Sequence, residues 1–358
     1  MIRLNAGDGI KGVLAVFIFG FLLLAGCICG ETAPPEMPPI GPPPAEPPAQ
    51  PECQSDSDCG GGFECSGGGC ILKLVSREEA LPEDAVKIAP ETDRIPPELH
   101  SDEFEEPVPM PGPINTAGGE DSPFMMPDGN TFYVFFTPDV RVPVEKQLLD
   151  GSTAIYVSHK VGGEWGEPER IVLNDDVSLD GCAFVQGNKM WFCSARPGYS
   201  GVHWFTAEYE GGKWQNWQNA DEELKTEEYE TGELHISADG NELYFHSFGP
   251  GGKGGLDVWV SEKVDGEWGE PVNVEAVNTE RDEGWPALNP AEDELWITRD
   301  YGIWRSKKVD GEWAEPELIV SALAGEATID NEGNVYFTHH FYENDTMLEA
   351  DIYVIYRK

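Results

Sequence analysis

The stretch KVDGEWGEPVNV, residues 263–274, occurs twice more in this chain in nearly the same form. Residues 308–319 read KVDGEWAEPELI, and residues 160–171 read KVGGEWGEPERI. A degenerate fourth copy, YEGGKWQNW, contains Trp214. The copies are marked by four tryptophans: Trp165, Trp214, Trp268 and Trp313. Their spacing of about 45–55 residues falls within the periods of repeat architectures, so the chain is expected to stack similar units.

Each copy is typical of a β-hairpin. An alternating strand such as LDVWVSEK precedes it, and an Asp-Gly or Gly-Gly pair supplies the two-residue turn, which requires positive φ. A second turn before an aromatic strand, as in ISADGNELYF, lies ahead of every copy. Five such first hairpins begin near residues 122, 182, 233, 285 and 326. Four-stranded antiparallel units repeated in this way predict an all-β fold, a β-propeller. The recurring tryptophans are expected to pack between neighbouring sheets.

The last unit lacks a fourth strand at its C-terminal end, because the chain stops at ADIYVIYRK. The missing strand is found near the N-terminus. Residues 104–123 align with residues 268–286, with Phe104 in the place of Trp268 and Pro107 in the place of Pro271. We therefore expect five blades, with the N-terminal strand closing the last one. Six blades are the alternative if residues 71–102 contain another hairpin.

The repeat resembles the TolB-type, WD40-like propeller repeat of prokaryotic exported proteins. The resemblance rests on ISADGNELYFHS, GGLDVWVSEKVDGEWGEPVNVEAVNT and DEGWPALNP, and it extends over residues 103–358. It implies a propeller fold but no single function, since such propellers serve as binding scaffolds and, in distant relatives, as lyases or hydrolases. Five blades would depart from the six of TolB itself.

The N-terminus has the features of an export signal. Arg3 and Lys11 precede the apolar run GVLAVFIFGFLLLAGC, which is too short for a comfortable membrane span. Its end resembles the lipobox of prokaryotic lipoproteins, which implies that Cys27 is acylated and anchors the exported protein to the outer face of the cell membrane or in the periplasm. The expected parts are a signal sequence (1–26), a lipidated Pro-rich linker (27–52), a Cys-rich module (53–70), a connector (71–102) and the propeller (103–358).

Six of the eight cysteines, those from Cys53 onward, are candidates for disulfides in an oxidising compartment. Four of them lie close together and predict two bridges of open connectivity: Cys53, Cys59, Cys65 and Cys70. A zinc site is disfavoured, because paired C-x-x-C arms are missing. Cys182 and Cys193 flank one hairpin turn symmetrically, so a Cys182–Cys193 disulfide is expected.

The net charge of the chain limits the classes of partner that it can bind. The chain has 66 acidic against 23 basic residues, a net charge of -43, which argues against nucleic acid. Phosphate-loop, nucleophile-elbow and H-E-x-x-H motifs are missing, which argues against nucleotide, serine-hydrolase and zincin chemistry. We expect a monomer that contacts the membrane through its lipid anchor. Calcium is conceivable because oxygen ligands are abundant, although no EF-hand-like loop occurs.

Long, irregular loops connect the second to the third strand of each unit. The crossings, which lead from the fourth strand of one unit to the first strand of the next, lie on the same face. This face is therefore expected to carry the site. The crossings supply acids: Glu120, Asp121, Asp180, Glu233, Asp282, Glu283 and Glu326. Second strands end in basic or imidazole groups, and one histidine lies on an innermost strand: Arg196, Arg299, His246, His339, His340 and His235. Any one of these acids can instead cap a turn or pair with an arginine.

Two functions fit this pattern. The favoured one is a surface-anchored binding module for a glycan, a cell-envelope polymer or a protein partner. The alternative is a carbohydrate-active hydrolase or lyase. A glycosidase needs two carboxyl groups about 5–10 Å apart, one with a raised pKa. Four acids are the catalytic candidates: Glu120, Asp180, Glu283 and Glu326.

Overall fold

A computed structural model of the chain describes residues 53–60, 62–173, 177–196, 198–199, 201–225, 229 and 231–358. The predicted signal sequence, with Cys27, and the Pro-rich linker lie outside the described residues. Among the helices that are described, none is long and apolar enough to cross a bilayer. The three short helices are α1 (Arg77–Ala80), α2 (Val144–Gln147) and α3 (Asp221–Leu224).

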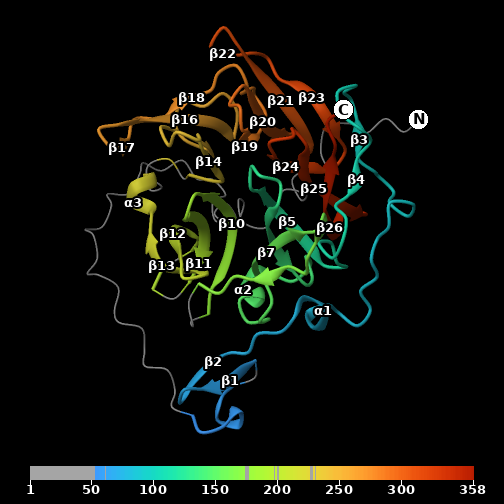
Figure 1. Cartoon of the computed structure of the whole chain (residues 1–358), viewed down its shortest axis with the longest axis vertical. Helices are drawn as coiled ribbons and strands as arrows, with labels where there is room; N and C mark the ends of the chain where they lie inside the picture. The colour runs from blue at the N-terminus through green and yellow to red at the C-terminus, as the bar shows by residue number, and fades with distance from the viewer. Residues whose placement is uncertain are drawn as a thin grey trace, which may run out of the picture.

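Antiparallel strands form meanders arranged around a common axis, so the fold is an all-β propeller (Figure 1). The first blade contains β5 (Gly119–Met125), β6 (Thr131–Thr137), β7 (Ala154–Val161), β8 (Glu164–Trp165) and β9 (Glu169–Arg170). The second contains β10 (Leu179–Gln186), β11 (Lys189–Ala195), β12 (His203–Glu210) and β13 (Lys213–Asn219). The third contains β14 (Leu234–Ile236), β15 (Glu242–Ser247), β16 (Asp257–Val264), β17 (Glu267–Trp268) and β18 (Val272–Asn273).

Two further groups of strands follow. The fourth contains β19 (Glu283–Leu288), β20 (Glu294–Arg299), β21 (Gly302–Val309), β22 (Glu312–Trp313) and β23 (Glu317–Ser321). The fifth contains β24 (Ala324–Ile329), β25 (Val335–Glu343), β26 (Thr346–Ile355) and the N-terminal strand β4 (Val108–Pro109). Because the first strand of every blade lies nearest the axis, these innermost strands together surround a central channel.

The repeated phrase forms the hairpin between the third and fourth strands of a blade. Asp265 and Gly266 at its turn have φ of 54° and 93°, as a two-residue turn requires. The tryptophan that follows packs toward the preceding blade. Trp214 lies 6.4 Å from Tyr133 of the first blade, and Trp313 lies 6.3 Å from Tyr244 of the third, measured between ring centroids. The tryptophans therefore hold adjacent sheets together.

The N-terminal segment closes the fifth blade. Val108 pairs with Val354 and Pro109 with Tyr353, in antiparallel register, and Phe104 forms a bridge with Arg357. Phe104 is fully buried and meets Trp296 edge to face at 6.0 Å. Between residues 73 and 102 the described chain contains α1 and the edge strand β3 (Glu98–Leu99), which pairs with β23, but no hairpin that would add a sixth blade.

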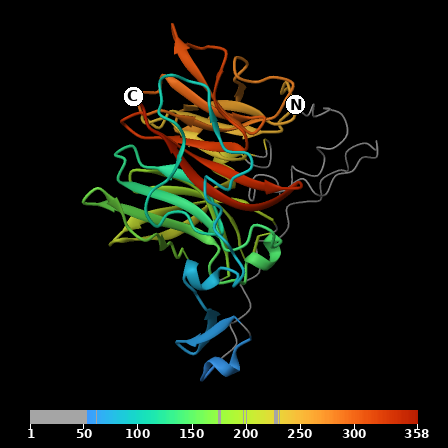
Figure 2. The same ribbon diagram turned by 90° about the vertical axis from the view of Figure 1, so that its right-hand side faces the viewer.

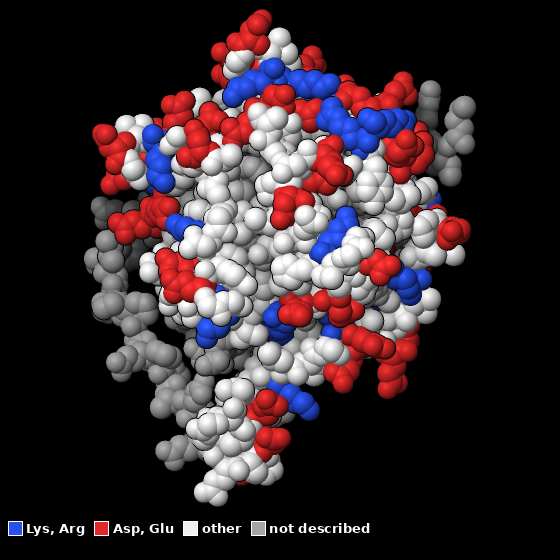
Figure 3. All heavy atoms as spheres, viewed as in Figure 1, with Lys and Arg blue, Asp and Glu red and all other residues white. Residues whose placement is uncertain are grey.

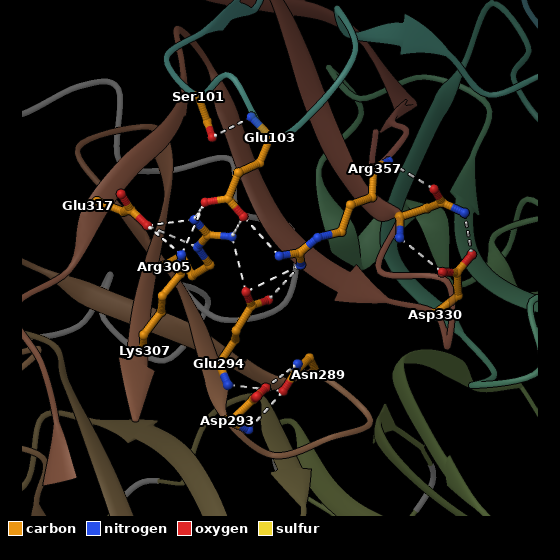
Figure 4. A network of polar contacts seen from close by, with 11 residues as sticks. Ser101, Glu103, Asn289, Asp293, Glu294, Arg305, Lys307, Glu317, Asp330 and Arg357 are labelled. Carbon is orange, nitrogen blue, oxygen red and sulfur yellow. Dashed lines mark hydrogen bonds and ion pairs between the residues drawn. The ribbon is translucent and has the colours of Figure 1, made fainter. Parts of the chain in front are cut away.

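An ion network fastens this closing segment to the two blades it joins (Figure 4). The buried guanidinium of Arg305 lies 2.7 Å from Glu103 Oε1, 3.0 Å from Glu294 Oε1 and 2.6 Å from Glu317 Oε1. Arg357 contacts the other oxygen of Glu103 at 2.8 Å. Hydrogen bonds from Arg305 hold the pKa of Glu103 at about 2, so this carboxylate stays ionised.

A Cys-rich module precedes the propeller and projects beyond its edge (Figure 2). It comprises the 3-10 turn η2 (Asp56–Asp58), β1 (Phe63–Ser66) and β2 (Gly69–Leu72). The two predicted disulfides are confirmed and their pairing is Cys53–Cys65 and Cys59–Cys70. With so little apolar surface to bury, a module of this size depends on such bridges.

The connector after this module packs along the propeller. Val75 donates its backbone N–H to Gly151, and the buried Arg77 forms an ion pair with Glu120 at 3.3 Å. Further along, Lys87 contacts both Glu349 and Asp351 of β26. The connector therefore binds side chains at blades one and five before it reaches β3.

The expected disulfide between Cys182 and Cys193 is wrong, because both residues are free buried thiols. A β-bulge between Gly181 and Phe184 shifts the register of the hairpin, so Cys193 lies opposite Gly181. Burial raises the pKa of both thiols. The symmetric spacing about the turn did not reveal this bulge.

Candidate functional site

A β-bulge recurs on the innermost strands and defines which side chains reach the axis. The bulged residues Ser122, Cys182, Trp285 and Glu326 have φ between 46° and 59°. In each case the register between the first and second strands shifts at that point. Together with Glu233 of the third blade, the bulged residues line one cavity on the axis, called here the axial cavity. A bulge re-aims a side chain, and in four of the blades it aims one at the axis.

Three of the four acids expected as catalytic candidates lie outside this cavity, in buried ion pairs. Their partners come from the connector or from second strands: Glu120 with Arg77 at 3.3 Å, Asp180 with Arg196 at 2.6 Å, and Glu283 with Arg299 at 2.7 Å. Arg196 also lies over the rings of Phe205 and Trp217, both at 4.4 Å. These acids and arginines therefore join blade elements to one another.

Glu326, the fourth candidate, meets Asp121 and Glu233 instead, and these three acids are called here the axial triad. Ser122 connects two of them, donating its N–H to Glu326 Oε2 at 2.9 Å and its hydroxyl to Glu233 Oε1 at 3.4 Å. The triad draws on three different blades. Among the described residues, no Lys or Arg forms an ion pair with any of the three.

Burial and mutual repulsion raise the pKa of two triad members. For Glu326 burial is the larger cause, followed by the charges of Asp121 and Glu233. For Glu233 burial again comes first, followed by Cys182 and Asp121. A protonated carboxyl group can donate as well as accept a hydrogen bond, and the raised pKa of Glu233 and Glu326 favours that form.

The predicted histidines surround the axis without forming a common group. His340 Nε2 lies 4.0 Å from Asp121 Oδ1, and its Nδ1 lies 3.2 Å from the carbonyl oxygen of Leu323. His246 contacts the backbone N–H groups of Glu233 and Trp285, at 3.3 and 3.1 Å. Burial lowers the pKa of His340, and it lowers the pKa of His246 to about 3, so both are neutral at neutral pH.

The remaining predicted residues lie apart from one another. His339 turns away from the axis and contacts Asp93 of the connector at 2.9 Å. Asp282 is exposed and accepts a hydrogen bond from the backbone of Leu256 at 2.9 Å. His235 lines the axial cavity and lies 5.0 Å from the ring of Phe184, and burial lowers its pKa to about 4.

Candidate metal ligands come together at one place in the described part of the chain. Within the described part of the chain, three His, Cys, Asp or Glu ligand atoms come together only at Cys53, Cys59 and Cys70. Those sulfurs are already joined in disulfides, so they do not fit a metal ion. The axial triad is not gathered that closely, and calcium on the axis stays a prediction.

The axial cavity is small, about 50 Å³. Since a cavity of about 150 Å³ accommodates benzene, this one accepts a polar group or a few water molecules but not a sugar ring. A second cavity of about 190 Å³ lies next to it along the channel, toward the turns between first and second strands. It is called here the turn-side cavity.

Several residues of this site were not predicted, notably Ser122, Cys182 and Trp285. A signal was present, because Gly181, Gly232, Gly284 and Gly325 each precede the axial residue of their blade. A Cβ at Gly232 or Gly284 would press against the ring of His246. A glycine followed by a residue whose type differs between blades therefore indicates the axial position better than the acids do.

Comparison with known proteins gives no family. No protein-family model and no curated protein sequence matches this chain. Among solved structures, an endo-arabinase from Bacteroides thetaiotaomicron is 16% identical, with 69% of this chain and 97% of that chain covered and a TM-score of 0.42. The putative TolB from Agrobacterium tumefaciens is 14% identical, with coverages of 68% and 92% and a TM-score of 0.35.

TolB from Acinetobacter baumannii is likewise 14% identical, covers 56% of this chain and has a TM-score of 0.32. This chain spans 46% of that protein. TolB proteins are the group that the repeat resembles. At these scores the similarities say nothing about the activity of this chain, and the propeller assignment rests on its own strand pairing.

Proposed function

We propose that this protein is an exported binding module, anchored through Cys27, which takes a hydrogen-bonding group of its ligand into the axial cavity. The observation that carries the proposal is the axial triad: Glu233 and Glu326 line the axial cavity, the charge of Asp121 acts on both, and none of the three pairs with a Lys or Arg among the described residues. Glu120, Asp180 and Glu283 of the same crossings each pair with an arginine, so the triad differs from them.

The size of the axial cavity favours binding over turnover. At about 50 Å³ it accepts a hydroxyl or amino group while the rest of the ligand stays outside. Carboxyl groups bind either kind of donor, which fits glycan hydroxyls or the amino groups of a partner. Tethering at the cell surface, as the lipobox resemblance implies, would present such a site to envelope polymers or to other proteins.

A glycoside hydrolase is the second candidate, favoured by the raised pKa of Glu233 and Glu326 beside Asp121. A protonated carboxyl group next to an ionised one is the pairing that glycoside hydrolysis uses. This candidate requires the cavity to widen, since a sugar ring does not fit it as it stands.

The test is a panel of polysaccharides, oligosaccharides and peptides, offered to the full-length chain in detergent, with binding and release of reducing ends measured together. Binding without cleavage, weakened at least about tenfold by Glu233→Gln or Glu326→Gln, is expected. Both variants resemble the protonated side chain, so they should fold. Glu312→Gln, on an exposed hairpin, is the matched control.

Cleavage that falls at least about a hundredfold in the same variants would establish the hydrolase instead. Ligand binding that ignores both substitutions would reject the axial cavity as the site.

A further inference from the structure

The turn-side cavity has the opposite character to the axial cavity. Its walls are mainly apolar, with Met125, Met126, Ile236, Leu288 and Ile329 among them. Its rim contains Pro127, Gly187 and Ala238, which lie in turns between first and second strands. At about 190 Å³ it exceeds the volume that accommodates benzene, so it can hold an apolar group.

A single layer of side chains separates the two cavities. Phe124, Phe184, His235 and Thr328 line both of them. The Phe184 ring lies 5.1 Å from Phe124 and 5.0 Å from His235, measured between centroids, so these three fill one side of the channel. Thr328 is the smallest member of the layer. A slender chain would pass beside it more readily than a planar ring.

Among the described residues no Lys or Arg pairs with the polar end of this path, where His340 Nε2 lies 4.0 Å from Asp121 Oδ1. Asp121 is only 3% exposed, and its Oδ1 atom has no hydrogen-bond partner. The charge of Asp121 acts on both Glu233 and Glu326, the two acids that line the axial cavity. A buried carboxylate oxygen without a partner is costly, and a cation with N–H donors would satisfy it.

Resting on the proposed function of the axial cavity, we propose that the channel binds a primary ammonium group carried on an unbranched apolar chain, which enters between the turns of first and second strands. The chain occupies the turn-side cavity, passes Thr328, and places its ammonium among Asp121, Glu233 and Glu326. The net charge of -43 draws such a cation toward the protein. Acidic side chains are spread over the face seen in Figure 3.

The same chemistry can come from a free alkylamine or from a lysine of a protein partner. The length of chain needed to reach the triad distinguishes these two sources. From Ser122 to Met126 a strand advances about 13 Å, at about 3.3 Å per residue. A lysine would therefore have to bring its backbone into the turn-side cavity, whereas a free chain would not. A guanidinium suits the small axial cavity less well, because it is planar and wider than an ammonium.

This entry route differs from the expected one. The sequence pointed to the face with the long loops between second and third strands. The turn-side cavity opens among the short turns of the opposite face, and there an apolar space adjoins the axial cavity.

Calorimetric titration of the full-length chain with methylammonium, butylammonium and hexylammonium tests the proposal. Affinity should rise about three- to fourfold per added methylene. Hexanol, with the same chain and no charge, should bind at least about tenfold more weakly than hexylammonium. Nα-acetyl-lysine methylamide tests the lysine source: binding that matches butylammonium identifies a partner's lysine, and weaker binding identifies a free amine.

Variants then test the ammonium-binding acids and the entry through the turn-side cavity separately. Glu233→Gln should weaken hexylammonium binding at least about tenfold. Ala238→Trp should weaken it by narrowing the rim while every triad member is unchanged, and Glu312→Trp on an exposed hairpin should not. Thermal unfolding of each variant verifies that it is folded.

Equal binding of hexanol and hexylammonium would overturn the ammonium assignment, and an undiminished affinity in Ala238→Trp would overturn the route. If no alkylammonium binds, this inference fails by itself. The proposed function would still stand if a member of the glycan or peptide panel binds and loses affinity in Glu233→Gln.

Discussion

At the scale of single residues, Arg299 and Arg281 lie close in sequence and each pairs with an acid, but in different surroundings. Arg299 and Glu283 are 10% and 0% exposed, at 2.7 Å, whereas Arg281 and Asp300 are 65% and 46% exposed, at 2.5 Å. We expect Arg299→Ala to lower the free energy of unfolding by about 3–5 kcal/mol, because Glu283 would be left buried without its partner.

Arg281→Ala is the matched control and should cost less than about 1 kcal/mol, because solvent already screens that pair. Urea denaturation of both variants measures the difference. Equal losses would mean that burial does not govern the strength of these pairs. The same comparison tests whether Glu283 has a structural role, as its ion pair indicates.

The acids of the strand crossings also show where sequence reasoning ends. The crossings were expected to supply acids to the site, and Glu233 and Glu326 do line the axial cavity. Glu120 and Glu283 lie two residues before the axial position of their blades, which Ser122 and Trp285 occupy. Alternation along a regular strand cannot predict this, since the bulge changes which side chain faces inward.

At the scale of elements, the strand that closes the ring was predictable from the repeat. Phe104 takes the position of a repeat tryptophan, and the segment that follows pairs with β26. The connector was not predictable, because its contacts are single side chains. Arg77, Lys87 and Asp93 each find a partner more than 40 residues away in sequence, and such pairs leave no periodic pattern.

Glu103 makes the closing segment sensitive to acid. Its pKa falls from 4.5 to about 2 in the folded protein, mainly through hydrogen bonds from Arg305. A depressed pKa contributes stability above pH 4.5 that is lost as the pH falls through about 2. Glu103→Gln should therefore lower the free energy of unfolding at neutral pH, by about 1 kcal/mol because Glu103 is partly exposed. The variant should also lose less stability than the wild-type chain as the pH falls toward 2.

Denaturation midpoints from pH 2 to pH 7 would show this difference between the wild-type chain and Glu103→Gln. Glu98→Gln, on the exposed edge strand β3, should behave like the wild-type chain. Parallel pH profiles for the wild-type chain and Glu103→Gln would contradict a role for the network in holding the ring closed.

At the scale of the whole molecule, buried acids with a raised pKa determine the response to alkali. Burial raises the pKa of Glu120 from 4.5 to about 7 despite Arg77, and it raises the pKa of Glu233, Glu326 and Asp351 well above the usual range. For such a group the fold favours the protonated form. Its stabilisation is complete below the unfolded pKa and is lost as the pH rises through the folded one.

The melting temperature should therefore rise as the pH is lowered from 8 to 5, before Glu103 and similar carboxylates begin to protonate. Glu120 alone accounts for about 3 kcal/mol, the equivalent of its shift from 4.5 to about 7. Protonation also reduces the self-repulsion of a chain with a net charge of -43, which acts in the same direction. Differential scanning calorimetry at fixed ionic strength measures this, and Glu120→Gln should remove the part of the change between pH 5 and pH 7. A melting temperature that rises toward pH 8 would show that ionised carboxylates stabilise the ring more than the buried acids oppose it.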